Sequence, residues 1–277
     1  MRWLGIATLL FLSTGALAQP RDRVISAGGA LTEIVFALGA DDRVIAVDTT
    51  SSEPAEVAAL PKIGYMRALS SEGVLALRPQ LLLAVAEVGP PAALRQIRDA
   101  GVRVVNGDAD HSIEGVKAKV RLVAQALGLS AAGVALESKI DGEWRTTQLA
   151  VGMPARPVRV LFVLAHGGTT LSLAGAETAA DAMIRYAGGT NAMSGFKGHR
   201  AATVEAVVAA QPDVILVTRE GIEALGGVGN LLAKPGFALT PAGRTKNVAS
   251  FDALYLLGFG PRTPQAVREL AERLRKS

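Results

Sequence analysis

The chain repeats one of its own passages, and this repeat limits the folds that are open to it. Residues 70–87 return as residues 203–220, and the alignment pairs Glu72 with Glu205 without a gap. A gapless match of this length indicates a duplicated unit. The copies begin 133 residues apart (203 − 70), which is far too long for a solenoid repeat. We therefore predict two related α/β lobes that face each other across a cleft, where ligands usually bind.

Both halves of the chain alternate strand patterns with helical patterns. Short apolar runs typical of buried strands end at turns, and helical spacing follows them. Successive units of this kind build parallel sheets, so each lobe is expected to have a central parallel sheet. We expect strands at residues 24–26, 43–47, 81–85, 102–105, 158–164 and 214–217. We expect helices at residues 31–38, 92–100, 112–127, 130–149, 178–187 and 264–275.

One helix is expected to join the two lobes. Two helical patterns follow the first lobe, with Gly128 as the stop between them and Pro154 as the stop beyond them. The second pattern is expected to bridge the lobes, and a single packed helix permits only modest closure. The predicted divisions are a signal peptide (1–18), an N-terminal α/β lobe (19–111), a helical segment with the interlobe helix (112–153) and a C-terminal α/β lobe (154–277).

The N-terminus has the pattern of a secretory signal peptide. A positive start and an apolar run over residues 3–12 precede a small-residue cleavage site, Ala16-Leu17-Ala18. The run is too short for a membrane anchor, which needs about 20 residues as a helix. The chain has no cysteine, so it has no lipid-attachment Cys, disulfide or thiolate metal site. These features predict a free protein of the bacterial periplasm.

A loop over residues 62–70 leads into the first copy of the repeat and is expected to border the cleft. It places Tyr65 two residues from Arg67, and in an extended loop residues two apart point the same way. A guanidinium stabilises a nearby phenolate by Coulomb attraction. A phenolate is a good ligand for ferric iron, and tyrosine is a known proximal ligand of haem. From spacing alone, however, a tyrosine packed against the edge of the lobe is the better interpretation.

The residues around this loop resemble the periplasmic haem-binding proteins of bacterial haemin ABC importers, which are class III substrate-binding proteins. The resemblance is close over residues 47–52 and 60–74, and it includes residues 257–264; its most specific part is the Gly-Tyr-Met-Arg loop. It extends over essentially the whole mature chain. It implies two α/β lobes joined by one long helix, with ferric haem b as the transported ligand and a tyrosinate ligand at the position of Tyr65. It also implies an inner-membrane ABC permease with its ATPase as partner, and such a shuttle is expected to work as a monomer.

Three histidines are the other candidate iron ligands. His166 follows the expected strand at 158–164, and some members of the family use a histidine of the second lobe opposite the tyrosine. A loop histidine hydrogen-bonded to backbone is an equally open interpretation of His166. The repeat alignment pairs the Tyr65 loop with the segment around His199, which makes that histidine a weaker candidate near the cleft. His111 lies at a helix start, where capping or exposure is the default.

The propionates of haem require cations. Arginine pairs with carboxylates in a two-pronged geometry that lysine does not match. Arg67 and Arg219 are the leading candidates, because one lies beside Tyr65 and the other follows the expected strand at 214–217. The family also places a second-lobe arginine near the tyrosinate, and Arg219 fits that role as well. Arg200, which repeats Arg67, and Lys62 are further candidates, although most arginines are simply solvated surface residues.

Glu72 and Glu205 hold equivalent positions at the start of the two repeated helices. Acidic side chains in the first turn of a helix are favoured by its dipole, which is one interpretation. The resemblance implies another, because paired surface glutamates in this class contact arginines of the permease. Both interpretations can hold together.

Other functions remain open. A siderophore or cobalamin binding protein of the same fold is the main alternative, and a siderophore would make Tyr65 a stacking residue. A bare metal ion is disfavoured because the histidines do not cluster. A secreted hydrolase is less expected, since the chain has neither a cysteine nor a Gly-x-Ser-x-Gly elbow. The net charge of +4 is modest and scattered, which does not favour nucleic acid.

Overall fold

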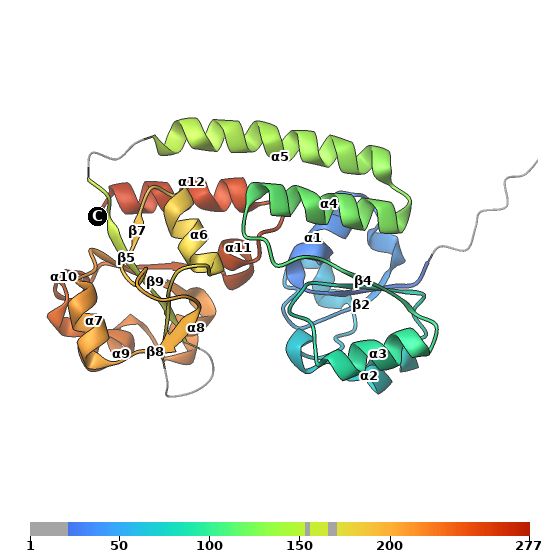
Figure 1. Cartoon of the computed structure of the whole chain (residues 1–277), viewed down its shortest axis with the longest axis horizontal. Helices are drawn as coiled ribbons and strands as arrows, with labels where there is room; N and C mark the ends of the chain where they lie inside the picture. The colour runs from blue at the N-terminus through green and yellow to red at the C-terminus, as the bar shows by residue number, and fades with distance from the viewer. Residues whose placement is uncertain (1–21, 153–155, 166–170) are drawn as a thin grey trace, which may run out of the picture.

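The computed structural model describes residues 22–152, 156–165 and 171–277, and it shows two α/β lobes side by side (Figure 1). The N-terminal lobe has a four-stranded sheet in the order β2-β1-β3-β4, with all neighbours parallel. Its strands are β1 (Val24–Ala27), β2 (Val44–Val47), β3 (Leu81–Ala84) and β4 (Arg103–Asn106). Its helices are α1 (Gly29–Ala37), α2 (Ser71–Ala76), α3 (Pro91–Asp99) and α4 (Ile113–Leu127). The strands and helices expected from the sequence are therefore confirmed in this lobe.

The C-terminal lobe has a sheet in the order β10-β9-β5-β6-β8, with β7 paired to β5. Its strands are β5 (Arg159–Leu164), β6 (Ser172–Ala174), β7 (Thr190–Asn191), β8 (His199–Ala201), β9 (Val214–Thr218) and β10 (Val248–Phe251). Its helices are α6 (Ala179–Tyr186), α7 (Val204–Ala210), α8 (Arg219–Ala224), α9 (Val228–Leu232), α10 (Pro241–Arg244), α11 (Ala253–Leu257) and α12 (Thr263–Arg275). The sheet is mixed, because β6 runs antiparallel to both β5 and β8. The predicted central parallel sheet is confirmed by the parallel strands β7, β5, β9 and β10, whereas β6 and β8 at the edge were not among the expected strands.

The duplication is visible in the backbone as well as in the sequence. Ser70 and Thr203 cap α2 and α7, and each side chain accepts a hydrogen bond from a backbone N–H of the first turn, at 3.1 Å in both cases. Arg78 and Gln211, which follow these helices, both have a positive φ, 47° and 40°. Each helix leads into a fully buried strand, β3 or β9. Two residues with left-handed backbone at matched positions indicate that the repeat is one structural unit used twice.

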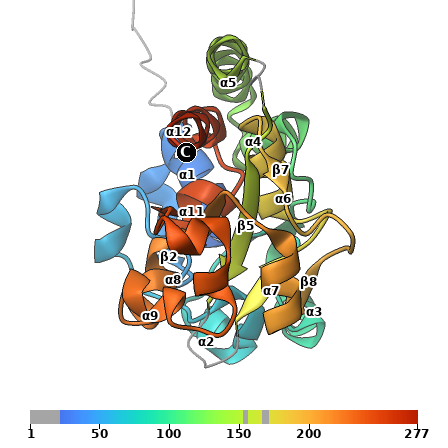
Figure 2. The ribbon, with the colours of Figure 1, turned by 90° about the vertical axis from the view of Figure 1, so that its left-hand side faces the viewer.

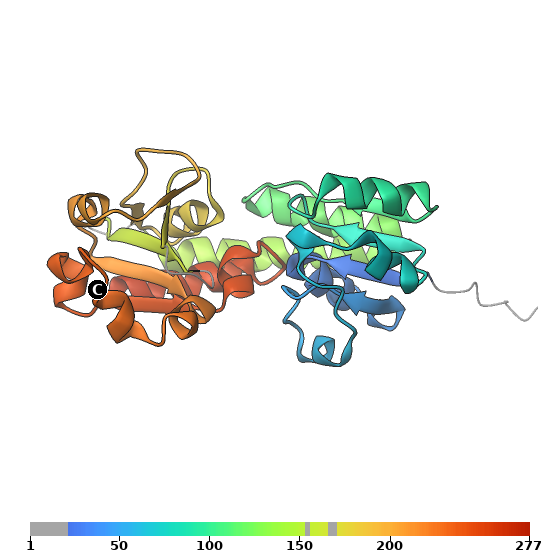
Figure 3. The same ribbon diagram turned by 90° about the horizontal axis from the view of Figure 1, so that it is seen from below.

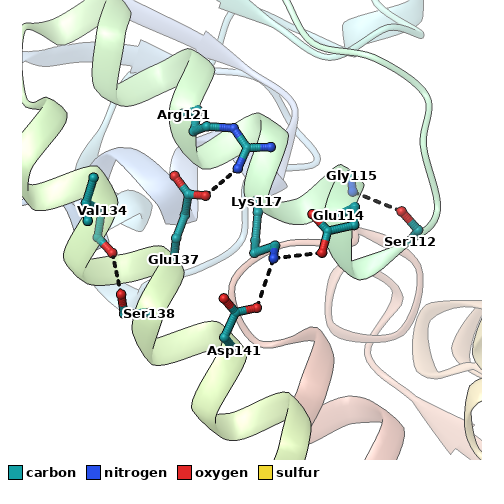
Figure 4. A network of polar contacts seen from close by, with 9 residues as sticks. All are labelled: Ser112, Glu114, Gly115, Lys117, Arg121, Val134, Glu137, Ser138 and Asp141. Atoms are coloured by element: carbon teal, nitrogen blue, oxygen red, sulfur yellow. Dashed lines mark hydrogen bonds and ion pairs between the residues drawn. The ribbon is translucent and has the colours of Figure 1, made fainter.

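The long helix α5 (Ser130–Val151) runs across both lobes (Figure 1), and Figure 2 shows it end-on. Its 22 residues extend about 33 Å at 1.5 Å per residue, which is long enough to cross from one lobe to the other. Ion pairs fasten its first half to α4 (Figure 4): Arg121 pairs with Glu137, and Lys117 bonds to Asp141 at 3.0 Å. None of the described helices is both long and apolar enough to cross a membrane. The prediction of a single interlobe helix is confirmed.

The lobes share a hydrophobic core. One cluster of buried apolar side chains includes Ile34 and Val120 of the N-terminal lobe together with Phe162 and Leu270 of the C-terminal lobe. Two smaller clusters lie within single lobes. Because close-packed cores deform little, this shared cluster favours lobes that move only slightly against each other.

The strands of the two sheets point toward one another across the junction between the lobes (Figure 3). The loops that follow the strands therefore face the other lobe. In open α/β sheets, ligands bind outside the carboxyl ends of the strands. This is the region in which the candidate residues are expected.

Candidate ligand-binding site between the lobes

Tyr65 lies on a loop between β2 and α2, and the residue is 41% exposed. Gly64 has a φ of +90°, a conformation that favours glycine, and its carbonyl accepts a hydrogen bond from Thr49 N–H at 3.0 Å. Beyond the tyrosine, the N–H of Gly89 donates to Met66 O at 3.0 Å, and the N–H of Leu69 donates to Gly89 O at 2.8 Å. The backbone on both sides of Tyr65 is thus fixed to neighbouring loops, while the phenol stays accessible to a ligand.

The expected alignment of Tyr65 with Arg67 rests on an extended loop, and that expectation is wrong. Residues Met66–Ala68 form a turn of 3₁₀ helix, and the extended backbone is limited to the flanking residues Tyr65 and Leu69. Residues two apart in a 3₁₀ helix point in different directions, since three residues complete a turn. Arg67 is exposed on this turn, and it makes no hydrogen bond to the described residues. It is available to an anionic group of a ligand, but the loop does not align it with the phenol.

A buried carboxylate that the sequence analysis missed organises these loops. Asp48 is fully buried just after β2 and accepts hydrogen bonds from the N–H groups of Gly28 (2.8 Å) and Thr50 (2.9 Å). It also accepts from the hydroxyls of Thr50 (2.6 Å) and Ser51 (2.8 Å). Asp48 therefore joins the loop after β1 to the loop after β2. Thr49, on the loop after β2, in turn donates its N–H to Gly64 O. Its position in an Asp-Thr-Thr-Ser run after a strand was the available signal.

Lys62 stabilises the segment that follows β2. Its ammonium donates to the carbonyls of Ser51 at 3.0 Å and Val57 at 3.3 Å, so it holds the segment after β2 in place. Its backbone also forms an isolated parallel bridge with Val47. These bonds occupy the amine, which makes Lys62 a weaker candidate for a propionate than the arginines.

Arg219 lies at the carboxyl end of β9, where it is the first residue of α8 and is exposed. Thr218, buried at 2% exposure, caps this helix by accepting from Gly221 N–H at 3.1 Å. The next residue, Glu220, accepts from the N–H of Ala253, at 3.2 Å for the nearer oxygen. The start of α8 is therefore well fixed, and Arg219 lies exposed at the carboxyl end of β9.

Arg200 and His199 lie on β8, the short strand at the edge of the C-terminal sheet, and both are exposed. The guanidinium carbon of Arg200 lies 4.5 Å from the centre of the Phe196 ring, a cation–π contact. His166 lies outside the residues that the structure describes. Among the described residues, no three His, Asp or Glu side chains form a group that could hold a metal ion.

His111 is half-buried at the lobe junction, where its ring lies 5.1 Å from the Phe259 ring at 57°. It does not cap α4, because Ser112 takes that role. Burial lowers the pKa of His111, and the positive charge of Lys119 lowers it further. The neutral imidazole is therefore favoured, and this histidine belongs to the contact between the lobes.

Glu72 and Glu205 occupy the second position of α2 and α7, and both are exposed. Each helix is anchored to its lobe by a buried valine, Val74 in α2 (0% exposed) and Val207 in α7 (1% exposed). The two carboxylates thus sit at matched, solvent-facing places on the two lobes. Each also lies in the first turn of its helix, where the helix dipole favours an acid.

A cavity of about 520 Å³ lies elsewhere, beside α1 and α5. Its lining includes Glu33, Glu53, Glu143, Arg262 and Gln265, and none of the candidate ligand-binding residues. Acidic side chains predominate, so the cavity is unsuited to an anionic cargo. The candidate haem-binding residues instead lie on the Tyr65 loop of the N-terminal lobe, and on β8 and the start of α8 in the C-terminal lobe.

Comparison with known proteins identifies this arrangement of two lobes and one long helix. The family model for periplasmic binding proteins matches residues 24–255. The chain belongs to the periplasmic binding protein family. This family consists of substrate-binding transport proteins, and the fold is that of its class III members.

Solved structures of this family include close matches. The chain is similar to the periplasmic haem-binding protein BhuT in complex with two haems, with 52% identity, a TM-score of 0.88, and coverage of 93% of this chain and 99% of that one. Among curated proteins, it is 27% identical over 253 residues to the uncharacterized ABC transporter substrate-binding lipoprotein YvrC of Bacillus subtilis, covering 90% of this chain and 79% of the relative. It is 25% identical over 272 residues to a vitamin B12-binding protein of Vibrio parahaemolyticus, covering 95% and 93%. The chain is therefore a substrate-binding protein of an ABC importer whose structure is close to that of haem-binding members.

Proposed function

We propose that this protein captures ferric haem b between its lobes through a Tyr65 tyrosinate and delivers it to an inner-membrane ABC permease with its ATPase. The observation that carries the proposal is the presentation of Tyr65: a tyrosine that is 41% exposed, on a loop whose backbone is hydrogen-bonded on both sides. A rigid, accessible phenolate is a suitable ligand for ferric iron. The similarity to a haem-bound structure supports the choice of cargo.

The arginines at the facing edges of the sheets supply the anion-binding part of the proposal. Arg67 and Arg219 are exposed on opposite lobes and are proposed to bind the propionates; Arg219 is also suited to stabilise the tyrosinate. Arg200 is a further candidate, although its guanidinium stacks on Phe196. Lys62 supports the loop through its carbonyl bonds, and any contact it makes with haem is secondary. His166 is proposed as a second axial ligand from the C-terminal lobe.

The route of the protein in the cell follows from the same proposal. Residues 1–18 are proposed to direct export and then to be removed, which leaves an N-terminal lobe (19–111), a helical segment with the interlobe helix (112–153) and a C-terminal lobe (154–277). The protein then acts as a periplasmic monomer. Glu72 and Glu205, exposed at matched positions, are proposed to dock on the permease, one carboxylate from each lobe.

Cobalamin is the second candidate cargo. It is favoured by the similarity to vitamin B12-binding proteins over nearly the whole chain. The two cargoes require different chemistry of Tyr65, because haem needs an iron–oxygen bond and the cobalamin alternative uses contacts without one. Tyr65→Phe, which removes only the phenol oxygen, therefore distinguishes haem binding from cobalamin binding.

The test is a titration of the purified apoprotein with ferric haem, followed by absorption spectroscopy. Wild type should give a saturable spectrum with tyrosinate character, and Tyr65→Phe should lose that character while keeping the ring. Tyr186→Phe is the matched control, since Tyr186 packs edge-on against Trp144 and should bind haem as wild type does. His166→Ala reports whether a second axial bond exists. No saturable uptake by wild type, with binding of cobalamin instead, would overturn the haem proposal.

A further inference from the structure

An ion pair between Arg262 and Glu33 joins the two lobes. Arg262, in the segment between α11 and α12, donates from Nε to Glu33 Oε2 at 3.2 Å and from Nη2 to Glu33 Oε1 at 2.5 Å. Glu33 lies on α1 of the other lobe, 229 positions away, and its side chain is only 9% exposed. The guanidinium also lies 5.0 Å from the ring of Tyr255, whose hydroxyl donates to Glu269 at 2.9 Å. Both oxygens of a nearly buried carboxylate are thus held by one arginine that is fixed in turn.

The backbones of the two lobes approach closely around this pair. A Cβ on Gly260 would lie 3.1 Å from Glu33 Oε2, and a Cβ on Gly29 would lie 2.6 Å from the side chain of Leu254. Phe259, with 1% exposure, packs against His111 of the first lobe. Glycine at both contact points permits an approach that a side chain would prevent. The segment 253–262 therefore fits against the first lobe at several points.

Hydrogen bonds, with one step along the backbone from Asp48 to Thr49, connect α1 to the Tyr65 loop. Thr32, adjacent to Glu33, bonds through its hydroxyl to Ser51 Oγ at 2.8 Å. Ser51 Oγ donates to Asp48 at 2.8 Å. The N–H of Thr49, next along the chain, donates to the carbonyl of Gly64, directly before Tyr65. Arg262 therefore binds α1, the same helix whose hydrogen bonds support the Tyr65 loop.

From these contacts we infer that Glu33 and Arg262 are positioning residues that set the angle and separation at which the C-terminal lobe faces the Tyr65 loop. The inference rests on the proposed function only for its effect on haem. Within the apoprotein, the pair holds the lobes in one orientation. In haem binding, that orientation would fix the position of the C-terminal lobe relative to the Tyr65 loop before haem binds.

The charges make the pair sensitive to the loss of either partner. Burial raises the pKa of Glu33, and the hydrogen bond from Arg262 opposes that rise. Without the arginine, the carboxylate would have to accept a proton or gain water from the nearby cavity, which both residues line. Either change alters the contact between α1 and the 253–262 segment. The expected result is a wider range of lobe orientations rather than the unfolding of a lobe.

The chain has no cysteine, so the lobe orientation can be measured by spin labels at two introduced sites. Asp99→Cys, at the end of α3, and Ala209→Cys, in α7, replace exposed residues of different lobes. Electron–electron resonance distances should be narrowly distributed in the labelled parent. Glu33→Gln and Arg262→Lys should each broaden the distribution and weaken haem binding by roughly tenfold, with an altered tyrosinate absorption band. The double variant should be little worse than either single variant, because the residues act as a pair.

Asp181→Asn is the matched control. Asp181 is also a buried carboxylate, with 8% side-chain exposure, and it pairs with Arg185 at 3.2 Å, but both residues lie on α6 within one lobe. This variant should lower the unfolding temperature and leave the interlobe distances and haem affinity unchanged. Distances as narrow in Glu33→Gln and Arg262→Lys as in the parent would overturn the inference. The distances are measured without haem, so a wild type that fails to bind haem would defeat the proposed function alone.

Discussion

Replacement of Asp48 by alanine should lower the free energy of unfolding by about 2–6 kcal/mol. The carboxylate is fully buried and accepts from the backbone N–H groups of Gly28 and Thr50 and from two hydroxyls. The hydroxyls can rotate toward other acceptors, but the two N–H groups are fixed by the backbone. An unsatisfied buried donor costs about 1–3 kcal/mol, so two give the stated range. This is a large share of the stability of a typical domain, about 5–15 kcal/mol.

Asp48→Asn provides a graded comparison. The carboxamide keeps one oxygen as an acceptor, and its NH₂ group replaces the oxygen that receives Thr50 N–H at 2.9 Å and the Thr50 hydroxyl at 2.6 Å. One fixed donor is then left without an acceptor, and the expected loss is about 1–3 kcal/mol. Because the same loop binds Gly64 through Thr49, both variants should also weaken haem binding.

The assay is denaturant unfolding followed by circular dichroism, with stability taken from the midpoint and slope. Asp99→Ala is the control, since Asp99 is exposed at the end of α3 and its loss should stay within about 0.5 kcal/mol. A loss for Asp48→Ala that is as small as the control would refute the reasoning. It would mean that water or a neighbouring group satisfies the N–H donors as well as the carboxylate does.

Three further outcomes are expected. Burial lowers the pKa of His111, so below about pH 6.5 the unfolded chain binds more protons than the folded protein, and stability should fall as the pH drops. His111→Phe keeps a ring against Phe259, and it should flatten this pH dependence in thermal unfolding scans. Phe162→Ala should cost about 3–5 kcal/mol in denaturant unfolding, because Phe162 is fully buried in the core shared by the lobes, and a loss near zero would contradict that packing. Glu72→Arg and Glu205→Arg should leave haem affinity unchanged and reduce haem transport by reconstituted permease; normal transport by both variants would remove the docking proposal.

Some of these features are local, and the sequence predicts them well. The strands β3 and β9 are continuous apolar runs, so their burial follows from composition alone. Ser112 before α4 and Gly128 after it mark the ends of that helix, and the structure uses them as caps. The repeated passage predicts two related lobes because the same local pattern folds the same way twice. Tyr65 was identified as a candidate by family resemblance, and its exposure is consistent with that interpretation.

Other features depend on neighbours that are distant in the chain. The strands β6 and β8 have only three residues each, too few to carry a periodic pattern, and their antiparallel pairing comes from the sheet that receives them. The 3₁₀ turn after Tyr65 depends on hydrogen bonds with Gly89, which lies on another loop. A local pattern contains no information about such partners.

The sequence by itself determined the duplication, the longer strands and helices, and the loop that carries Tyr65, because propensity, capping and apolar periodicity act over a few residues. Only the tertiary structure decided how the lobes meet. Glu33 and Arg262 are 229 positions apart, and nothing in the pattern around either residue indicates the other. Their pairing arises because a nearly buried carboxylate needs a cation, and folding brings the start of α12 to the place where that cation is required.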